Sequence, residues 1–172
     1  MKEFVKRKPN RLSNYDYSQN GAYFITICTY NRKCILSDIV GAIHELPVVN
    51  LTVYGRIVDK IIADVQKRFD AVISNYIIMP NHIHMLLEIT NGERAIRELP
   101  LQKTHSTVSN IVGYLKMNSA KEIHKINKDI KVWQRSYYDH IVRNDVDYEE
   151  IWNYIENNSL KWKEDRFYCD VM

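Results

Sequence analysis

The chain has 172 residues, 45% of them hydrophobic, and a formal net charge of +3, which fits a folded domain rather than a disordered chain. No run of about 18 consecutive apolar residues is present and no apolar signal core follows the basic N-terminus, so we expect neither a membrane-spanning helix nor export. The three cysteines, an odd number without metal-ligand spacing, argue against a disulfide framework. We therefore expect a single cytoplasmic domain over residues 1–172.

Positive charge is concentrated at the start of the chain. Residues 2–11 carry five positive charges against one negative charge and show little hydrophobic periodicity. We assign residues 1–20 to a basic N-terminal arm, and two interpretations stay open because charge runs are commonly only solvated. The arm either keeps the protein soluble or contacts a polyanion such as DNA through Lys6, Arg7, Lys8 and Arg11.

The first predicted element is a strand over residues 22–30, which is rich in β-branched and aromatic residues and follows the turn signal Asn20-Gly21. A helix over residues 55–69 comes next. It is indicated by apolar residues at helical spacing, namely Val58, Ile61, Ile62, Val65 and Phe69.

Two apolar strands follow, over residues 72–79 and 82–89, and Pro80-Asn81 between them suits a tight hairpin. A second helix is predicted over residues 107–125, and Val132-Trp133 is the expected last strand. The resulting order β-α-β-β-α-β is the split βαβ arrangement. We predict an α+β fold, similar to ferredoxin and the RNA-recognition motif, in which two helices cover one face of an antiparallel sheet.

The most informative stretch contains His82 and His84 on the predicted strand 82–89. Alternate side chains of a strand share a face, so the two imidazoles point the same way, about 7 Å apart along the strand. Imidazole is a good ligand for divalent metals, and the pair can converge on one cation if a third ligand is present. Taken alone, the motif leaves ordinary half-exposed histidines as the alternative.

Four ordered blocks carry a resemblance to a known family. They read Gly21-Ala-Tyr-Phe-Ile-Thr, Met79-Pro-Asn-His-Ile-His-Met-Leu, Trp133-Gln-Arg-Ser-Tyr-Tyr-Asp-His and Asp147-Tyr-Glu-Glu-Ile-Trp-Asn-Tyr-Ile-Glu-Asn-Asn158. With these blocks the sequence resembles the HUH nucleases, specifically single-tyrosine transposases of the insertion-sequence-200 type and the REP-associated tyrosine transposases. One departure is Asn158-Ser159, where the family often has Asn-Pro.

The resemblance implies a site and an activity. His82, His84 and Asn158 would hold Mg²⁺ or Mn²⁺, and Tyr154 would attack a DNA phosphodiester to form a 5′-phosphotyrosine intermediate. The substrate would be single-stranded DNA that forms hairpins from palindromes. By the same resemblance we expect a monomer or homodimer associated with the bacterial nucleoid and with no membrane partner.

The last block also supports this assignment through its helical periodicity. Its apolar stripe, on the predicted helix 147–158, consists of Tyr148, Ile151, Trp152 and Ile155. Tyr154 lies about 120° around the helix from this stripe, and Asn158 follows one turn later on the same flank. We interpret Asp147-x-x-Glu150 as a capping box that fixes the helix start. The sequence thus predicts a catalytic tyrosine helix on the open face of the sheet.

Weaker candidates for DNA contact are four cations, each of which is equally well a solvated surface charge: Lys116, Lys121, Arg135 and Arg143. Trp133, Tyr137 and Tyr138 are candidates for stacking on bases, with packing as the alternative for Trp133. The rival function is a non-catalytic RNA-binding module on the same scaffold, although the aromatic signature strands of that family are missing. A DNA-binding descendant that no longer transposes, or a replication initiator or relaxase, also stays open.

Overall fold

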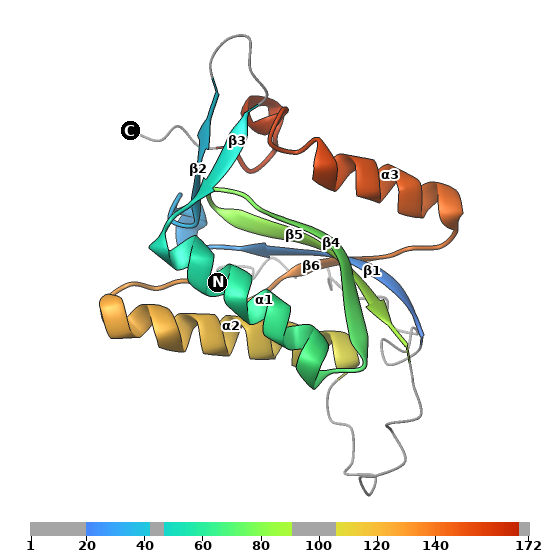
Figure 1. Ribbon diagram of the computed structural model, residues 1–172, viewed down its shortest axis with the longest axis horizontal. Coiled ribbons are helices and arrows are strands. Elements are labelled where there is room, and N and C mark those ends of the chain that lie inside the picture. The colour runs from blue at the N-terminus through green and yellow to red at the C-terminus, as the bar shows by residue number, and fades with distance from the viewer. Residues whose placement is uncertain (1–19, 42–46, 91–105, 169–172) are drawn as a thin grey trace, which may run out of the picture.

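A four-stranded antiparallel sheet is the centre of the fold (Figure 1). The computed structural model describes residues 20–41, 47–90 and 106–168. Across the sheet the strands are β4 (Ala71–Ile78), β5 (His82–Ile89), β1 (Gly21–Cys28) and β6 (Tyr138–Ile141). The two strands that begin and end the split βαβ unit, β1 and β6, are therefore neighbours, as that topology requires.

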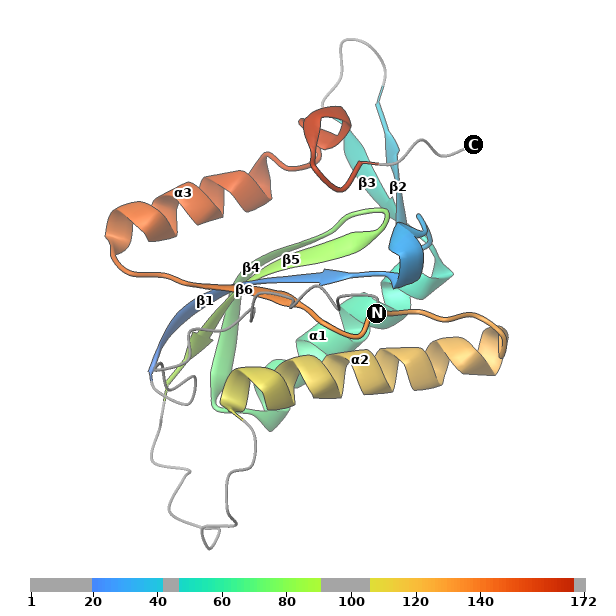
Figure 2. The ribbon, with the colours of Figure 1, turned by 180° about the vertical axis from the view of Figure 1, so that it is seen from behind.

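Helices cover both faces of this sheet. Two of them, α1 (Val53–Arg68) and α2 (Thr107–Ile126), lie side by side on one face, and α3 (Asp145–Glu156) lies on the other face (Figures 1 and 2). The predicted α+β fold with a helix across the open face is confirmed. Among the described residues, no helix is long and apolar enough to cross a membrane.

The large core lies between the sheet and the helix pair. Helix α1 begins at the N-cap Thr52, whose side chain accepts a hydrogen bond from the Gly55 backbone N–H, and its apolar stripe is buried. Gly55 permits a close approach, because a Cβ atom there would lie 2.0 Å from the Leu36 carbonyl oxygen. Helix α2 begins at the N-cap Ser106 in the same way.

The alternation along β5 divides its residues between the two faces. Ile83 and Met85 are fully buried in the core under α1 and α2, as the sequence predicts. His82 and His84 point to the opposite face, paired in the β1 register with Cys28 and with Thr26. A single strand therefore supplies both the core and the histidine pair.

A short hairpin between β1 and α1 was not predicted. It consists of β2 (Ser37–Val40) and β3 (Val48–Leu51), paired antiparallel, and it projects beyond the sheet on the side where the chain returns after α3 (Figure 1). Each strand has four residues of alternating exposure, too short for a clear periodic signal. Before it, the 3-10 turn η1 (Tyr30–Arg32) contains two residues in the left-handed region, Asn31 and Arg32.

The last strand was predicted at the wrong place. Val132-Trp133 does not form a strand of the sheet; Trp133 forms only an isolated bridge with Thr29, and β6 lies five residues further on. Trp133 instead donates a hydrogen bond from its indole N–H to Ser119 Oγ at 2.9 Å. Its contact with α2 explains why this apolar pair belongs to the core without lying in a strand.

The tyrosine helix begins and ends two residues earlier than predicted. Its N-cap is Asn144, whose side chain accepts from the Asp147 backbone N–H, so the proposed capping box starting at Asp147 is wrong. The Asp147 carboxylate instead accepts from the Arg143 backbone N–H and contacts His140. Trp152, assigned to the apolar stripe, is 37% exposed.

Candidate active site

The candidate site lies on the face of the sheet beneath α3. His82 and His84 are completely buried there, and their ring centroids are 4.4 Å apart. The pairing of β5 with β1 places Phe24 and Thr26 beside them, and aromatic residues from beyond α3 close the site from above. Two adjacent imidazoles in a closed apolar setting are an arrangement that ordinary surface histidines do not adopt.

His82 is held with one ring nitrogen directed toward the centre of the site. Its Nδ1 lies 2.8 Å from Asn81 Oδ1, and Asn81 donates through Nδ2 to the Phe167 carbonyl oxygen at 2.7 Å. Because the amide oxygen can only accept, His82 Nδ1 carries the proton and Nε2 keeps its lone pair. That Nε2 is buried without a hydrogen-bond partner. A hydrogen bond to the other ring nitrogen, as from His82 Nδ1 to Asn81, is what orients a metal-binding histidine.

His84 is fixed by contacts at both ring nitrogens. Thr26 Oγ1 lies 2.9 Å from Nδ1, and the Phe24 ring stacks on the imidazole at 5.0 Å between centroids. Nε2 faces the Tyr154 hydroxyl at 3.3 Å. The nitrogen that would bind a metal therefore also lies next to the tyrosine.

Both histidines are neutral at physiological pH. Burial lowers the pKa of His82 to about 4, against the opposing effect of the nearby Asp165 charge. Burial, the neighbouring His82 and Arg166 hold the pKa of His84 well below its usual value. Metal binding requires the neutral imidazole, so burial keeps both rings in the form that can act as ligands.

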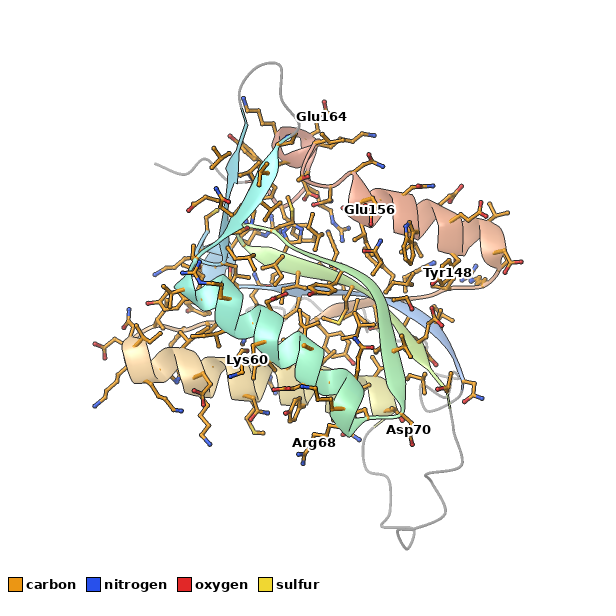
Figure 3. The ribbon with its side chains drawn as sticks, in the orientation of Figure 1. Lys60, Arg68, Asp70, Tyr148, Glu156 and Glu164 are labelled. Atoms are coloured by element: carbon orange, nitrogen blue, oxygen red, sulfur yellow. The ribbon has the colours of Figure 1, made fainter. Side chains whose placement is uncertain are left out.

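Helix α3 is anchored over the site by a small apolar cluster and two polar contacts. Ile151 and Ile155 pack on Leu86 of β5. Tyr148 donates to Glu88 Oε1 at 2.7 Å, and Glu156 accepts from the side-chain amide of Asn75 at 3.1 Å. Figure 3 shows Tyr148 and Glu156 on this helix, which the two contacts tie to β4 and β5. These anchors set the direction in which Tyr154 points.

Tyr154 lies at the border between the buried histidines and solvent. Its side chain is 42% exposed, and its ring meets Phe24 edge-on at 5.8 Å. The hydroxyl donates to Asp165 Oδ2 at 3.2 Å, and Asn158 donates to the same oxygen at 3.2 Å. Burial and the Asp165 carboxylate raise the pKa of Tyr154, so a nearby cation is needed to make the phenol a nucleophile.

Asp165 is the residue that the sequence analysis missed. It follows α3 and the 3-10 turn η3 (Trp162–Glu164), in a segment that folds back because Trp162 and Phe167 are buried beside His82. The Phe167 backbone N–H donates to Asp165 Oδ1 at 2.6 Å and fixes the carboxylate. The sequence signal for this return is a set of apolar residues in a segment otherwise rich in charge, with Trp162, Phe167 and Tyr168 among them.

The side chains fit a divalent metal ion. One ligand atom each from His82, His84 and Asp165 lies within 4.8 Å of the others. Two atoms in this region are buried without a hydrogen-bond partner, His82 Nε2 and Asn158 Oδ1, and unsatisfied buried polar atoms of this kind need an explanation. Two imidazole nitrogens with carboxylate and amide oxygens form a donor set that suits Mn²⁺, and the oxygens suit Mg²⁺.

A cavity of about 500 Å³ lies beside Tyr154. One wall is a flank of α3, and the other is the returning segment that contains Asp165 and Arg166. The residues that line it are Glu150, Asn153, Tyr154, Asn157, Asn158, Lys161, Glu164, Asp165 and Arg166. Tyr154 and Asn158 therefore open into the same space, as their shared flank predicts.

The predicted cations are not all near this site. Lys116 on α2 donates from Nζ to the carbonyl oxygens of Gln134 and Arg135. Lys121 is exposed on α2, on the other face of the sheet, and Arg135 and Arg143 are exposed on the segments around β6. The predicted contacts of Lys6, Arg7, Lys8 and Arg11 lie outside the described residues.

Comparison with known proteins gives consistent matches over most of the chain. A family model described as IS200-like transposase matches residues 18–158. A Haemophilus influenzae protein of uncharacterised function is 33% identical over 174 residues, which cover 95% of this chain and 94% of the relative. A second protein of that species, which carries the name REP-associated tyrosine transposase as a provisional assignment, is 26% identical over 184 residues, with 93% and 88% of the two chains covered.

Among solved structures, a REP-associated tyrosine transposase bound to a REP hairpin has a similar fold. The TM-score is 0.59 and the sequence identity 18%, with 94% of this chain and 74% of that chain covered. The family match includes His82, His84, Tyr154 and Asn158 and ends before Asp165.

Proposed function

This chain belongs to the IS200-like transposase family, and we propose that it cuts and rejoins single strands of DNA through a covalent bond to Tyr154. Membership in this family implies a DNA-cleaving enzyme and argues against the RNA-binding alternative. The observation that carries the proposal is the position of the Tyr154 hydroxyl, 3.3 Å from His84 Nε2 and hydrogen-bonded to Asp165.

In the proposed metal site, His82, His84 and Asn158 hold the ion and Asp165 is an additional ligand. The support is the convergence of ligand atoms from His82, His84 and Asp165, together with the hydrogen bond that Asn158 donates to Asp165. His82 and Asn158 each have a buried atom without a hydrogen-bond partner. Mg²⁺ or Mn²⁺ bound there would polarise the scissile phosphate and offset the charge that develops on it. Since both ions accept oxygen ligands readily, phosphate oxygens can complete the coordination shell.

In the proposed cleavage step, Tyr154 Oη attacks the phosphorus of a phosphodiester. The proton of the hydroxyl passes to the Asp165 carboxylate, which already accepts its hydrogen bond. The bond between phosphorus and the 3′-oxygen breaks, the 5′-phosphate stays on Tyr154, and the 3′-oxygen takes up a proton from solvent water to become a free hydroxyl. Attack of a 3′-hydroxyl on the phosphotyrosine reverses the step and joins a new pair of ends.

The proposed substrate is single-stranded DNA that folds into a hairpin from a palindrome. This proposal rests on the solved relative, which is described as bound to a REP hairpin. The catalytic tyrosine helix, the basic arm over residues 1–20, the monomer or homodimer and the location at the bacterial nucleoid stay predictions. So does the organisation of residues 1–172 as one domain.

The test is an adduct assay on labelled hairpin oligonucleotides taken from the DNA that flanks the gene. The wild-type protein should form an adduct resistant to denaturing gels in Mn²⁺ and none in EDTA, and Tyr154→Phe should form none in either. Tyr76→Phe is the matched control, because the Tyr76 hydroxyl donates to Asp59 on the other side of the sheet. Tight DNA binding by wild type without an adduct would reject cleavage and favour the DNA-binding descendant.

A further inference from the structure

Two arginines from distant parts of the chain meet on one aromatic ring beside the site. The guanidinium carbon of Arg32 lies 5.1 Å from the centroid of the Phe167 ring, and that of Arg166 lies 4.5 Å from it. Arg32 also donates from Nη1 to the Arg166 carbonyl oxygen at 3.2 Å. The two charges are therefore within about 10 Å of each other, the Debye length at about 0.1 M salt, so a single anion experiences both.

The ring that they share is part of the wall of the site. Phe167 is buried, and its ring centroid lies 4.7 Å from that of His82. Arg166 also lines the cavity beside Tyr154. The Coulombic effect of Arg166 acts on three groups of the site, lowering the pKa values of both histidines and opposing the rise at Tyr154. Arg166 is thus placed at the entrance to the candidate metal site, and Arg32 lies against the same ring, with a charge that also acts on His82.

Arg32 is presented by a backbone conformation that non-glycine residues rarely adopt. The φ angles of Asn31 and Arg32 are 52° and 54°, so two successive residues lie in the left-handed region. The turn is held from within the site, because the buried Asn81 side chain donates to the Arg32 carbonyl oxygen at 3.3 Å. Local strain that persists in this way is a common feature of functional sites.

An exposed aromatic ring on the edge strand β6 lies next to Arg166. The guanidinium of Arg166 lies 5.7 Å from the ring centroid of Tyr138 on β6, and Tyr138 is 44% exposed. Cations that follow the backbone and exposed rings that accept bases are the two features by which proteins bind single-stranded nucleic acid. Three carboxylates also line the cavity, those of Glu150, Glu164 and Asp165, and they repel a phosphate. A phosphate can therefore lie only on the side of the cavity where Arg166 supplies positive charge.

We propose that Arg32 and Arg166 form a clamp for the backbone phosphates of single-stranded DNA next to the scissile bond, with Tyr138 as a stacking surface for an adjacent base. This inference rests on the proposed function, since it names the residues that would bring the strand to Tyr154. It adds two cations that the sequence patterns did not single out.

The experiment measures binding of a short fluorescein-labelled single-stranded oligonucleotide by anisotropy, in EDTA, between about 50 and 200 mM NaCl. The variants are Arg32→Gln, Arg166→Gln and the double variant. The matched control is Arg68→Gln, because Arg68 also lies over an aromatic ring, 5.2 Å from the Tyr114 centroid, but on the other side of the sheet. Figure 3 labels Arg68 at the end of α1, far from Glu164.

The logarithm of the association constant falls linearly as the logarithm of the salt concentration rises. Each clamp variant should make this negative slope less steep by about 0.7, because one positive charge fewer neutralises the strand. Each should also weaken binding about fivefold at about 0.1 M salt. The double variant should make the slope less steep by about 1.4, and Arg68→Gln should behave like wild type. Arg166→Lys should restore the slope, since it keeps the charge. Thermal melts confirm that each variant is folded.

Slopes for the clamp variants that match wild type would overturn the proposal, as would a loss that Arg166→Lys does not restore. The adduct assay separates this failure from failure of the proposed function. Normal adducts together with unchanged slopes reject the clamp alone. Reduced slopes in a protein that forms no adduct support the clamp and reject strand cleavage.

Discussion

The two faces of the sheet differ in what they bury. Beneath α1 and α2 the sheet contributes apolar side chains to one large core, whereas the α3 face has two small buried apolar clusters among the described residues, one of Leu86, Ile151 and Ile155 and one of Cys28, Met79, Trp162 and Phe167. Beside these clusters the α3 face buries polar groups, the histidines and Asn158 among them. Stability and chemistry are thus divided by face, and β5 contributes to both.

This division has an energetic reason. A buried polar atom without a partner costs about 1–3 kcal/mol, and the α3 face contains two such atoms, at His82 and Asn158. Apolar packing on the other face offsets that cost, since each fully buried aliphatic side chain contributes about 1.5–3 kcal/mol. Most of the apolar packing therefore lies on the face opposite the site.

The largest expected effect on stability comes from a substitution on β5, and it is compared with a substitution of the neighbouring residue. Met85→Ala should lower the free energy of unfolding by about 2–5 kcal/mol, because it leaves a cavity in the core. His84→Gln should cost less, since an amide can keep the contact with Thr26, but it should abolish the rise in melting temperature that Mn²⁺ gives to wild type. Urea unfolding in EDTA and thermal melts with Mn²⁺ measure both.

Met85→Leu, which conserves volume, is the control for the core variant and should cost less than about 1.5 kcal/mol. A normal Mn²⁺ response in His84→Gln would show that the two faces are not divided in this way.

The next expected effect is a dependence of the free energy of unfolding on pH. It is caused by the histidines that are buried on the α3 face. The pKa of His82 is about 4 in the folded state against 6.5 as its ordinary value, so between these pH values the unfolded chain binds more protons. Stability from this group is therefore complete above pH 6.5 and is lost as the pH falls toward 4. From His82 alone, metal-free wild type should lose about 2 kcal/mol between about pH 7 and 5, where the carboxylates stay ionised. His84, whose pKa is also held well below its usual value, should add a loss of the same sign.

Urea unfolding at the two pH values in EDTA measures this loss, and His82→Gln should reduce it to the part that His84 contributes. An unfolding free energy that does not change between them in wild type would contradict the burial of a neutral imidazole.

The smallest effect concerns the attachment of α3. Tyr148→Phe removes the hydrogen bond to Glu88 and should cost about 1 kcal/mol of unfolding free energy. Because this contact helps to direct Tyr154, the rate of adduct formation should fall several-fold, while Mn²⁺ binding stays unchanged. Stopped adduct reactions with excess protein measure the rate.

Tyr76→Phe is again the matched control, since it also removes a tyrosine-carboxylate hydrogen bond, to Asp59 on the opposite side of the sheet. It should cost a similar free energy without slowing the reaction. Equal rates for the two variants would reduce Tyr148 to a purely structural role.

Local periodicity was sufficient to predict the parts of the fold that have a strong repeating pattern. The bounds of β5 were predicted as residues 82–89, because the histidines alternate with buried apolar residues over eight positions. The helices were predicted within about two residues at each end. The β2–β3 hairpin and β6 were missed because strands of four residues with half-exposed faces carry too little pattern.

The site divides in the same way. His82 and His84 could be proposed as a pair because their relation is local to one strand. Tyr154 and Asn158 were proposed from the family resemblance, with their shared helix flank in support. Asp165 and Arg32 could not be proposed, since their positions depend on a return of the chain and on a left-handed turn that no spacing encodes. The contacts that place them are long-range, and the sequence gives buried anchors such as Trp162 and Phe167 as a hint.

The buried side-chain amide of Asn81 connects three segments of the chain at the candidate site. Asn81 contacts His82, the Arg32 carbonyl oxygen and the Phe167 carbonyl oxygen, the last across 86 positions of sequence. During synthesis β5, which carries the histidines, is made before β6 and before Phe167, so the segment that contains Asp165 is the last part of the site to be added. The site is therefore completed late in translation, after the strand that carries the histidines has been made.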